Sequence, residues 1–171
     1  MSAALANDLA DDLAETGALY AGFAAAFHYP EAPGWLTAPE YLAAFDPGAC
    51  AEATSLHEAA YARMDTGALF EELVRFYEHF GLRRQEKAEL PDHLAVELEF
   101  MHVLCALDQA AVERGEAPDA VHAAQRDFLD RHLRPLLAGL LDKRMGREGR
   151  ATALIEACRD LVEAHRAALD D

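Results

Sequence analysis

The stretch from Pro91 to Gly115, PDHLAVELEFMHVLCALDQAAVERG, is more apolar than a helix at the surface needs to be. At about 100° per residue, its apolar side chains cover more than half of a helical circumference. Only a narrow strip opposite is polar, with Glu99, His102 and Gln109. A helix with so wide an apolar surface is covered by neighbours on most sides. The sequence therefore predicts a bundle with this helix at its centre.

Length and composition favour one helical domain. The chain has 171 residues, of which 52% are hydrophobic, which is enough for one real core but not for two independent ones. Ala and Leu dominate, whereas Val, Ile and Thr are sparse, and this balance favours helices over strands. We therefore expect an all-α fold, a single helical-bundle domain of about seven to nine helices over residues 1–171.

Local signals predict where several helices begin and end. Thr37, with Glu40 three positions later, is typical of a capping box. Asp46-Pro47 and Asp65-Thr66 are typical helix starts, and Gly81 is a typical stop. Pro135 must break or kink the helix in which it lies, because proline lacks the donor and clashes with the preceding turn. The predicted helices are residues 5–27, 37–45, 46–64, 65–80 and 92–115, one from 118 that meets Pro135, and a last one after the loop at 146–149.

Charge and the absence of targeting signals limit the possible partners and location. The formal net charge of −16 argues against nucleic acid or an anionic membrane as the main partner, because both need clustered Lys and Arg. The acidic N-terminus lacks the basic segment of a secretory signal, and no apolar run is long enough for a membrane helix. Cys50, Cys105 and Cys158 stand too far apart for a zinc motif. We expect a cytoplasmic protein with no cofactor, no metal and no stable membrane insertion.

Glu97 lies inside the apolar arc of the central helix, and three interpretations of it stay open. It can accept hydrogen bonds from a neighbouring helix, with His93 packed one turn above. A metal site is the second, because Glu99 and His102 form the Glu-x-x-His of di-iron bundles, although no second copy exists. The third is a polar cluster at the edge of a binding cleft, in which Asp92 orients His93 and Glu97 lies one turn further on. An unpaired buried carboxylate is costly, so the environment of Glu97 matters in each.

The segment before the central helix resembles a motif of a known family. Glu89-Leu90-Pro91-Asp92-His93, followed by ELEFM at 97–101, is similar to the signature of the TorD/DmsD/NarJ family of cytoplasmic chaperones that mature molybdenum enzymes. The flanking stretches LYAGFAAAFHYP, at 19–30, and FLDRHLRPLL, at 128–137, add weaker similarity in the same order along the chain.

This resemblance implies a fold, a function and a site. The bundle would consist of an N-terminal half of about residues 1–82 and a C-terminal half of about 92–171, joined by a hinge at about 83–91. The protein would be a non-catalytic chaperone that binds the N-terminal segment, a twin-arginine signal or a vestigial leader, of the catalytic subunit of a molybdenum oxidoreductase. It would act as a monomer or a homodimer. The peptide-binding residues would be Glu89, Pro91, Asp92, His93, Glu97, Tyr77 and Phe80.

Two other functions remain as alternatives. A helical scaffold or anti-aggregation protein would have the same composition and no specific client. An acid/base enzyme would use His93 with Asp92 and Glu97, but no nucleophile, metal set or phosphate-binding loop accompanies these residues.

Overall fold

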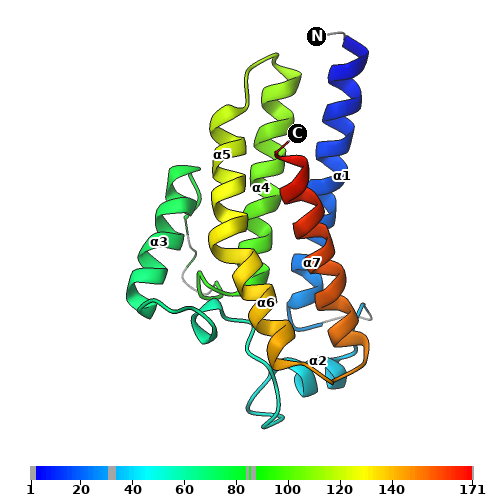
Figure 1. Cartoon of the computed structure of the whole chain (residues 1–171), viewed down its shortest axis with the longest axis vertical. Helices are drawn as coiled ribbons and strands as arrows, with labels where there is room; N and C mark the ends of the chain where they lie inside the picture. Colours follow the sequence, from blue (N-terminus) through cyan, green and yellow to red (C-terminus); the bar gives the residue numbers. More distant parts are fainter. Residues whose placement is uncertain (1–2, 31–33, 84, 86–87, 171) are drawn as a thin grey trace.

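The computed structural model describes residues 3–30, 34–83, 85 and 88–170, with the side chains of residues 3–11 left aside. The described part of the chain is helical, and it contains no β-strand beyond one isolated bridge. This confirms the predicted all-α class. The long helices run side by side along the long axis of the molecule, and α3 lies to one side (Figure 1). The helices are α1 Ala3–Phe27, α2 Ala38–Phe45, α3 Thr66–His79, α4 Leu94–Glu113, α5 Asp119–Phe128, α6 Arg134–Lys143 and α7 Arg150–Ala168.

The predicted central helix is α4, and its burial follows the sequence pattern. Leu94, Leu98, Met101 and Leu104 have no exposed surface, and α1 packs along α4 over much of its length. The two helices approach closely at Gly17, where an added Cβ would lie 3.2 Å from the Cβ of Cys105. The division of the chain into halves around residues 83–91 stays a prediction. In this structure α1 and α4, which it assigns to different halves, belong to one core.

Several predicted helix boundaries are confirmed by their capping contacts. The hydroxyl of Thr37 accepts a hydrogen bond from the backbone of Glu40, whose carboxylate accepts one from the backbone of Thr37 in return. Asp65 caps α3 through the backbone N–H groups of Gly67 and Ala68. Gly81, just after α3, has a φ of 78°, the left-handed conformation that glycine adopts without strain.

The helix predicted for residues 46–64 is wrong. Asp46 closes a turn instead, because its carboxylate accepts a hydrogen bond from the backbone of Gly48 at 2.7 Å. Turns follow at residues 47–49 and 51–52, and the N–H of Thr54 then donates to the carbonyl of Ala44. Only the short 3-10 turn Glu58–Ala60 is helical in this segment. Its flanking residue Leu56 accepts a backbone hydrogen bond from Leu94 at 2.8 Å. Tertiary pairing therefore overrides the local helix signal here.

Pro135 does not end its helix. Between α5 and α6 the backbone stays in the right-handed helical region through a five-residue π-helical turn, Leu129–Leu133, and Pro135 lies in the first turn of α6. Widening the preceding turn accommodates the missing donor without a break. When α5, the π-helical turn and α6 are counted as one continuous helix, the described residues contain six helices, slightly below the expected seven to nine.

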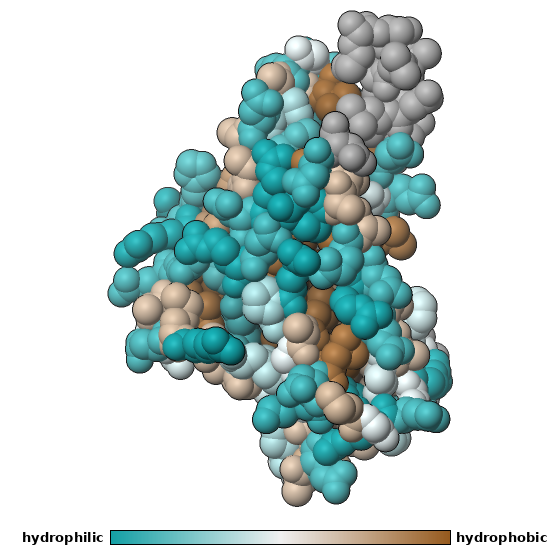
Figure 2. Space-filling model, in the orientation of Figure 1, coloured by the Kyte–Doolittle hydropathy of each residue, from teal (hydrophilic) through white to brown (hydrophobic). Residues whose placement is uncertain are grey.

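Hydrophilic side chains cover most of the face shown in Figure 2, with a narrow strip of apolar atoms between the lower parts of α6 and α7. Within the described residues, no helix is both long enough and apolar enough to cross a membrane.

Candidate functional site

The loop before α4 is fixed by its own side chains. His93 is the N-cap of α4, and its Nδ1 accepts a hydrogen bond from the N–H of Ala95 at 3.2 Å. Asp92 does not hydrogen-bond to His93, contrary to the interpretation in which it orients that ring. Its buried carboxylate accepts hydrogen bonds from the His57 ring at 3.0 Å and from the N–H of Ala59 at 3.2 Å. These contacts tie the start of α4 to the segment around the 3-10 turn.

Three histidine rings lie in a row beside this loop. The ring of His93 stacks on His28, with centroids 6.0 Å apart, and meets His57 edge-on at 5.1 Å. Burial, together with the nearby His57 and His28, lowers the pKa of His93 to about 4, so this ring is neutral. The hydrogen bond to Asp92 raises the pKa of His57, against the opposing effect of burial.

Glu97 is fully buried one turn into α4, as the wheel predicted, but it faces another acid. Burial and the neighbouring Glu58 and Asp92 raise the pKa of Glu97 well above its usual value. Both carboxyl oxygens of Glu97 are buried without a hydrogen-bond partner among the described residues, and the nearby charge of Glu58 favours the protonated form of Glu97. Glu58 in turn accepts from Nδ1 of the buried His132 at 3.1 Å. Glu97 is therefore part of a buried acid–histidine cluster.

Sequence reasoning did not single out Glu58 or His132. Glu58 lies in the segment taken for a helix, which obscured its role. His132 lies within the stretch 128–137 that contributed to the family resemblance, and that similarity was the only available signal. Nothing local indicates that Glu58 lies near both His132 and Glu97, because the three residues come from distant parts of the chain.

Glu99 and His102 do not converge on a common point. Glu99 accepts a hydrogen bond from Nε2 of His28 at 3.2 Å, whereas Nδ1 of His102 donates to the carbonyl of Gly17 at 2.8 Å. Among the described residues, no three ligand-type side chains are grouped so that they could hold a metal ion.

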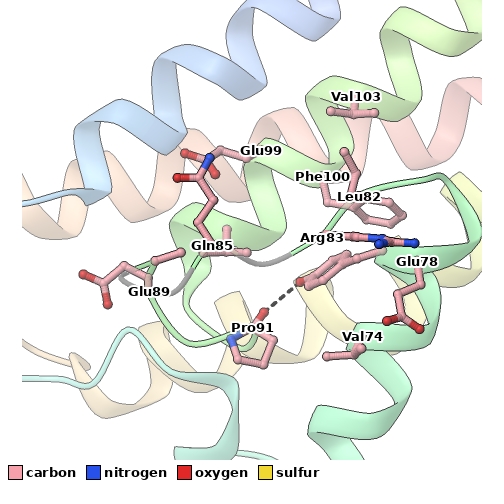
Figure 3. A pocket seen from close by; sticks show the side chains of 13 residues that line it. Val74, Glu78, Leu82, Arg83, Gln85, Glu89, Pro91, Glu99, Phe100 and Val103 are labelled. Atoms are coloured by element: carbon pink, nitrogen blue, oxygen red, sulfur yellow. Dashed lines mark hydrogen bonds between the residues drawn. The ribbon is translucent and has the colours of Figure 1, made fainter.

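A pocket of about 650 Å³ opens between α3, the 82–91 segment and α4 (Figure 3). One end of the pocket is acidic, with Glu89 and Glu99. The other, the apolar end, has Leu82, Phe100 and Val103, with the charged side chains of Arg83 and Glu78 beside them. Behind the apolar end lies a group of aromatic rings, in which Phe100 lies 4.9 Å from Tyr77 and 4.7 Å from Phe128 between centroids. The pocket therefore has carboxylates at one end and most of its apolar side chains at the other.

The structure places the predicted site residues in two layers. Glu89, Pro91 and Tyr77 line the pocket, and the Tyr77 hydroxyl donates to the Pro91 carbonyl at 2.7 Å, the dashed line in Figure 3. Phe80 packs on Phe100 behind the wall, at 5.8 Å between centroids. The remaining three, Asp92, His93 and Glu97, are buried and lie outside the pocket lining. A role in peptide binding stays a prediction for all seven.

Comparison with known proteins decides the family. The family model described as "Nitrate reductase delta subunit" matches residues 4–142. The chain belongs to this family. The match confirms the resemblance to TorD/DmsD/NarJ chaperones that the motif at 89–93 indicated.

Three assembly chaperones have sequences similar to this chain. The chain is 36% identical to the "Selenate reductase assembly chaperone protein" of Thauera selenatis, over 96% of this chain and 95% of that protein. It is 35% identical to the "Chlorate reductase assembly chaperone protein" of Ideonella dechloratans, with the same two coverages. Over 57% of this chain and 43% of the relative, it is 40% identical to the "Dimethyl sulfide dehydrogenase assembly chaperone protein" of Rhodovulum sulfidophilum.

Proposed function

We propose that this protein is a system-specific assembly chaperone for a molybdenum oxidoreductase of the DMSO-reductase type. It binds the N-terminal segment of the catalytic subunit, a twin-arginine signal or a vestigial leader, until the cofactor is inserted, and it does so in the cytoplasm. The names of its relatives, which cover nearly the whole chain, support the general role. The pocket beside α4, with its acidic end and its apolar end, is the observation that supports binding of a peptide segment.

The chemistry of such a peptide matches the pocket. A signal segment carries arginines followed by an apolar stretch. Glu89 and Glu99 suit the arginines, because charge-assisted hydrogen bonds to guanidinium are strong and directional. Leu82, Phe100 and Val103 suit an apolar helix laid in a groove. The net charge of −16 adds a long-range attraction for a basic segment.

The buried residues of the motif act through position in this proposal. Asp92 and His93 hold the loop that carries Glu89 and Pro91, and Glu97 is buried in the first turn of α4. The position of His93 argues against an acid/base enzyme. Its ring is buried, its Nδ1 accepts a hydrogen bond from the N–H of Ala95, and it does not line the pocket.

A peptide titration tests the proposal. The probe is a synthetic peptide with an Arg-Arg pair followed by a Leu/Ala helix, and binding is measured by calorimetry. Replacing both Glu89 and Glu99 by Gln removes charge while keeping shape, and we expect about a tenfold loss of affinity. Glu113→Gln is the matched control, because Glu113 is exposed on the same helix and bonds only to Gln109 among the contacts described. Equal affinity of the Glu89/Glu99 double variant and of the Glu113→Gln control would mean that the peptide binds outside this pocket.

A capture experiment in the native host distinguishes the alternatives. We expect the tagged protein to retain the catalytic subunit of one molybdenum oxidoreductase, and to lose it when the first residues of that subunit are deleted. A general anti-aggregation protein would instead retain many unrelated chains and would be indifferent to the deletion. An enzyme would turn over a metabolite with no protein client.

A further inference from the structure

A second pocket, of about 540 Å³, lies between the end of α1 and the segment that leads to α2. Two aromatic side chains with large exposed areas line it, Trp35 at 59% and Tyr29 at 53%. Both rings are supported from behind. Trp35 stacks on Phe23 with centroids 6.3 Å apart, and Tyr29 meets Tyr41 edge-on at 5.8 Å. Exposed aromatic rings held in place are typical of binding surfaces, because little side-chain freedom is lost on contact.

The second pocket adjoins the first. Glu89 lines both of them. In addition, His28 lines the second pocket and donates to Glu99, which lines the first, at 3.2 Å. In Figure 3, Glu89 and Glu99 lie at the end of the first pocket that is nearer to α1. We call the two adjoining pockets together the groove, which has an apolar end, an acidic centre at Glu89 and Glu99, and an aromatic end.

We propose that the aromatic end binds the residues that precede the basic pair of the client segment, with a preference for a bulky apolar or aromatic side chain there. This inference rests on the proposed function, which places the arginines at Glu89 and Glu99 and the following apolar stretch beside Phe100. The direction of the chain then follows. Residues before the arginines leave the acidic centre on the opposite side, toward Tyr29 and Trp35.

Charge favours a peptide over a second copy of this chain on the aromatic end. Each copy carries a net charge of −16, and Glu89 contributes negative charge at this pocket. A second copy would bring like charge to an already acidic rim, whereas a basic segment gains attraction from it. The groove thus fits a partner whose cations are flanked by apolar residues on both sides.

The fluorescence of the single tryptophan reports binding at the aromatic end. Trp35 lines the second pocket and does not line the first. The long probe is a tryptophan-free peptide with Phe-Phe, then Arg-Arg, then a Leu/Ala helix. The short probe is acetylated and begins at Arg-Arg. We expect both to bind by calorimetry, the long one about tenfold more tightly. Only the long probe should shift the Trp35 emission to shorter wavelength.

A variant separates this groove from non-specific contact. Tyr29→Ala should lower the affinity for the long probe to that for the short probe and leave the short probe unchanged. Met145→Ala is the control, since Met145 is 78% exposed and lines neither pocket.

Equal affinity for both probes, with unchanged Trp35 emission, would overturn this inference and leave the proposed function intact. If neither probe binds, the proposed function fails as well. A shift that depends only on protein concentration would identify a second copy as the occupant and would also overturn the inference.

Discussion

At the residue scale, the contact between Glu97 and Glu58 has the clearest consequence. Burial and the neighbouring carboxyls of Glu58 and Asp92 raise the pKa of Glu97, so Glu97 keeps its proton at a pH where a free glutamate has lost it. His132 and the N–H of Glu58, which donates to the Asp92 carbonyl at 2.8 Å, hold Glu58 in place. The cluster therefore couples the folded state to proton uptake.

The Glu97→Gln variant tests this coupling through the pH dependence of stability. The pKa of Glu97 is raised by folding, so the unfolded state releases a proton that the folded state keeps. Raising the pH above the ordinary pKa of glutamate therefore favours unfolding until the folded group also ionises. We expect wild-type stability to fall relative to the Gln variant by on the order of 1 kcal/mol per pH unit in this window. Urea titrations across the window measure it.

The matched control is Glu113→Gln on the same helix, because Glu113 is exposed and bonds only to Gln109 among the contacts described. Its stability should follow that of the wild type across the same pH window. Parallel curves for wild type and Glu97→Gln would mean that Glu97 is ionised in the folded protein.

At the scale of elements, α6 depends on a glycine for its packing. An added Cβ at Gly139 would lie 2.6 Å from two atoms of the Tyr61 ring, closer than side chains approach each other. Tyr61 is itself fixed, since its hydroxyl donates to the Ser55 carbonyl at 2.6 Å. The ring thus joins the irregular segment 46–64 to α6, and this contact competes with the helix that local signals favour there.

Two glycine substitutions should have opposite signs. Gly→Ala within a helix ordinarily stabilises by about 0.5–1 kcal/mol, because glycine loses more freedom on folding. Gly22→Ala on α1 should show this gain, because nothing lies within 4 Å of the added Cβ. Gly139→Ala should instead destabilise by about 1–3 kcal/mol, the usual range for overpacking. Thermal melts of both variants measure the difference, and a stabilised Gly139→Ala would show that the Tyr61 ring moves away easily.

At the scale of the whole molecule, one excess of charge should have two opposite effects. The formal net charge of −16 causes self-repulsion in the folded chain and attraction to a basic client. Salt weakens both, because the screening length falls to about 10 Å at 0.1 M.

We therefore expect added NaCl to raise the melting temperature and, in the same range, to weaken binding of the Arg-Arg peptide. Calorimetry and thermal melts at low and physiological salt measure the two effects. A peptide with Gln-Gln in place of Arg-Arg is the control, and its weaker binding should hardly change with salt. Salt-independent binding of the Arg-Arg peptide would exclude a charged contact.

The sequence alone was sufficient where the signal is local or periodic. The burial of α4 could be predicted because its apolar side chains recur at helical spacing around most of the circumference. The capping box at Thr37 and the start at Asp65 could be predicted because each side chain bonds to a backbone N–H within three residues. The motif at 89–93 indicated the family without any knowledge of its contacts.

Only the tertiary structure decided the contacts between distant segments. The segment around Glu58 pairs with the backbone at 92–94, and this pairing, invisible to local propensity, replaces the predicted helix and brings Glu58 against Glu97. The helix that contains Pro135 continues because the π-helical turn before it accommodates a residue without a backbone N–H. The division of the motif into pocket-lining and buried residues also depends on packing. Local sequence determines which backbone conformations have low free energy, whereas burial and pairing depend on which distant surfaces come into contact.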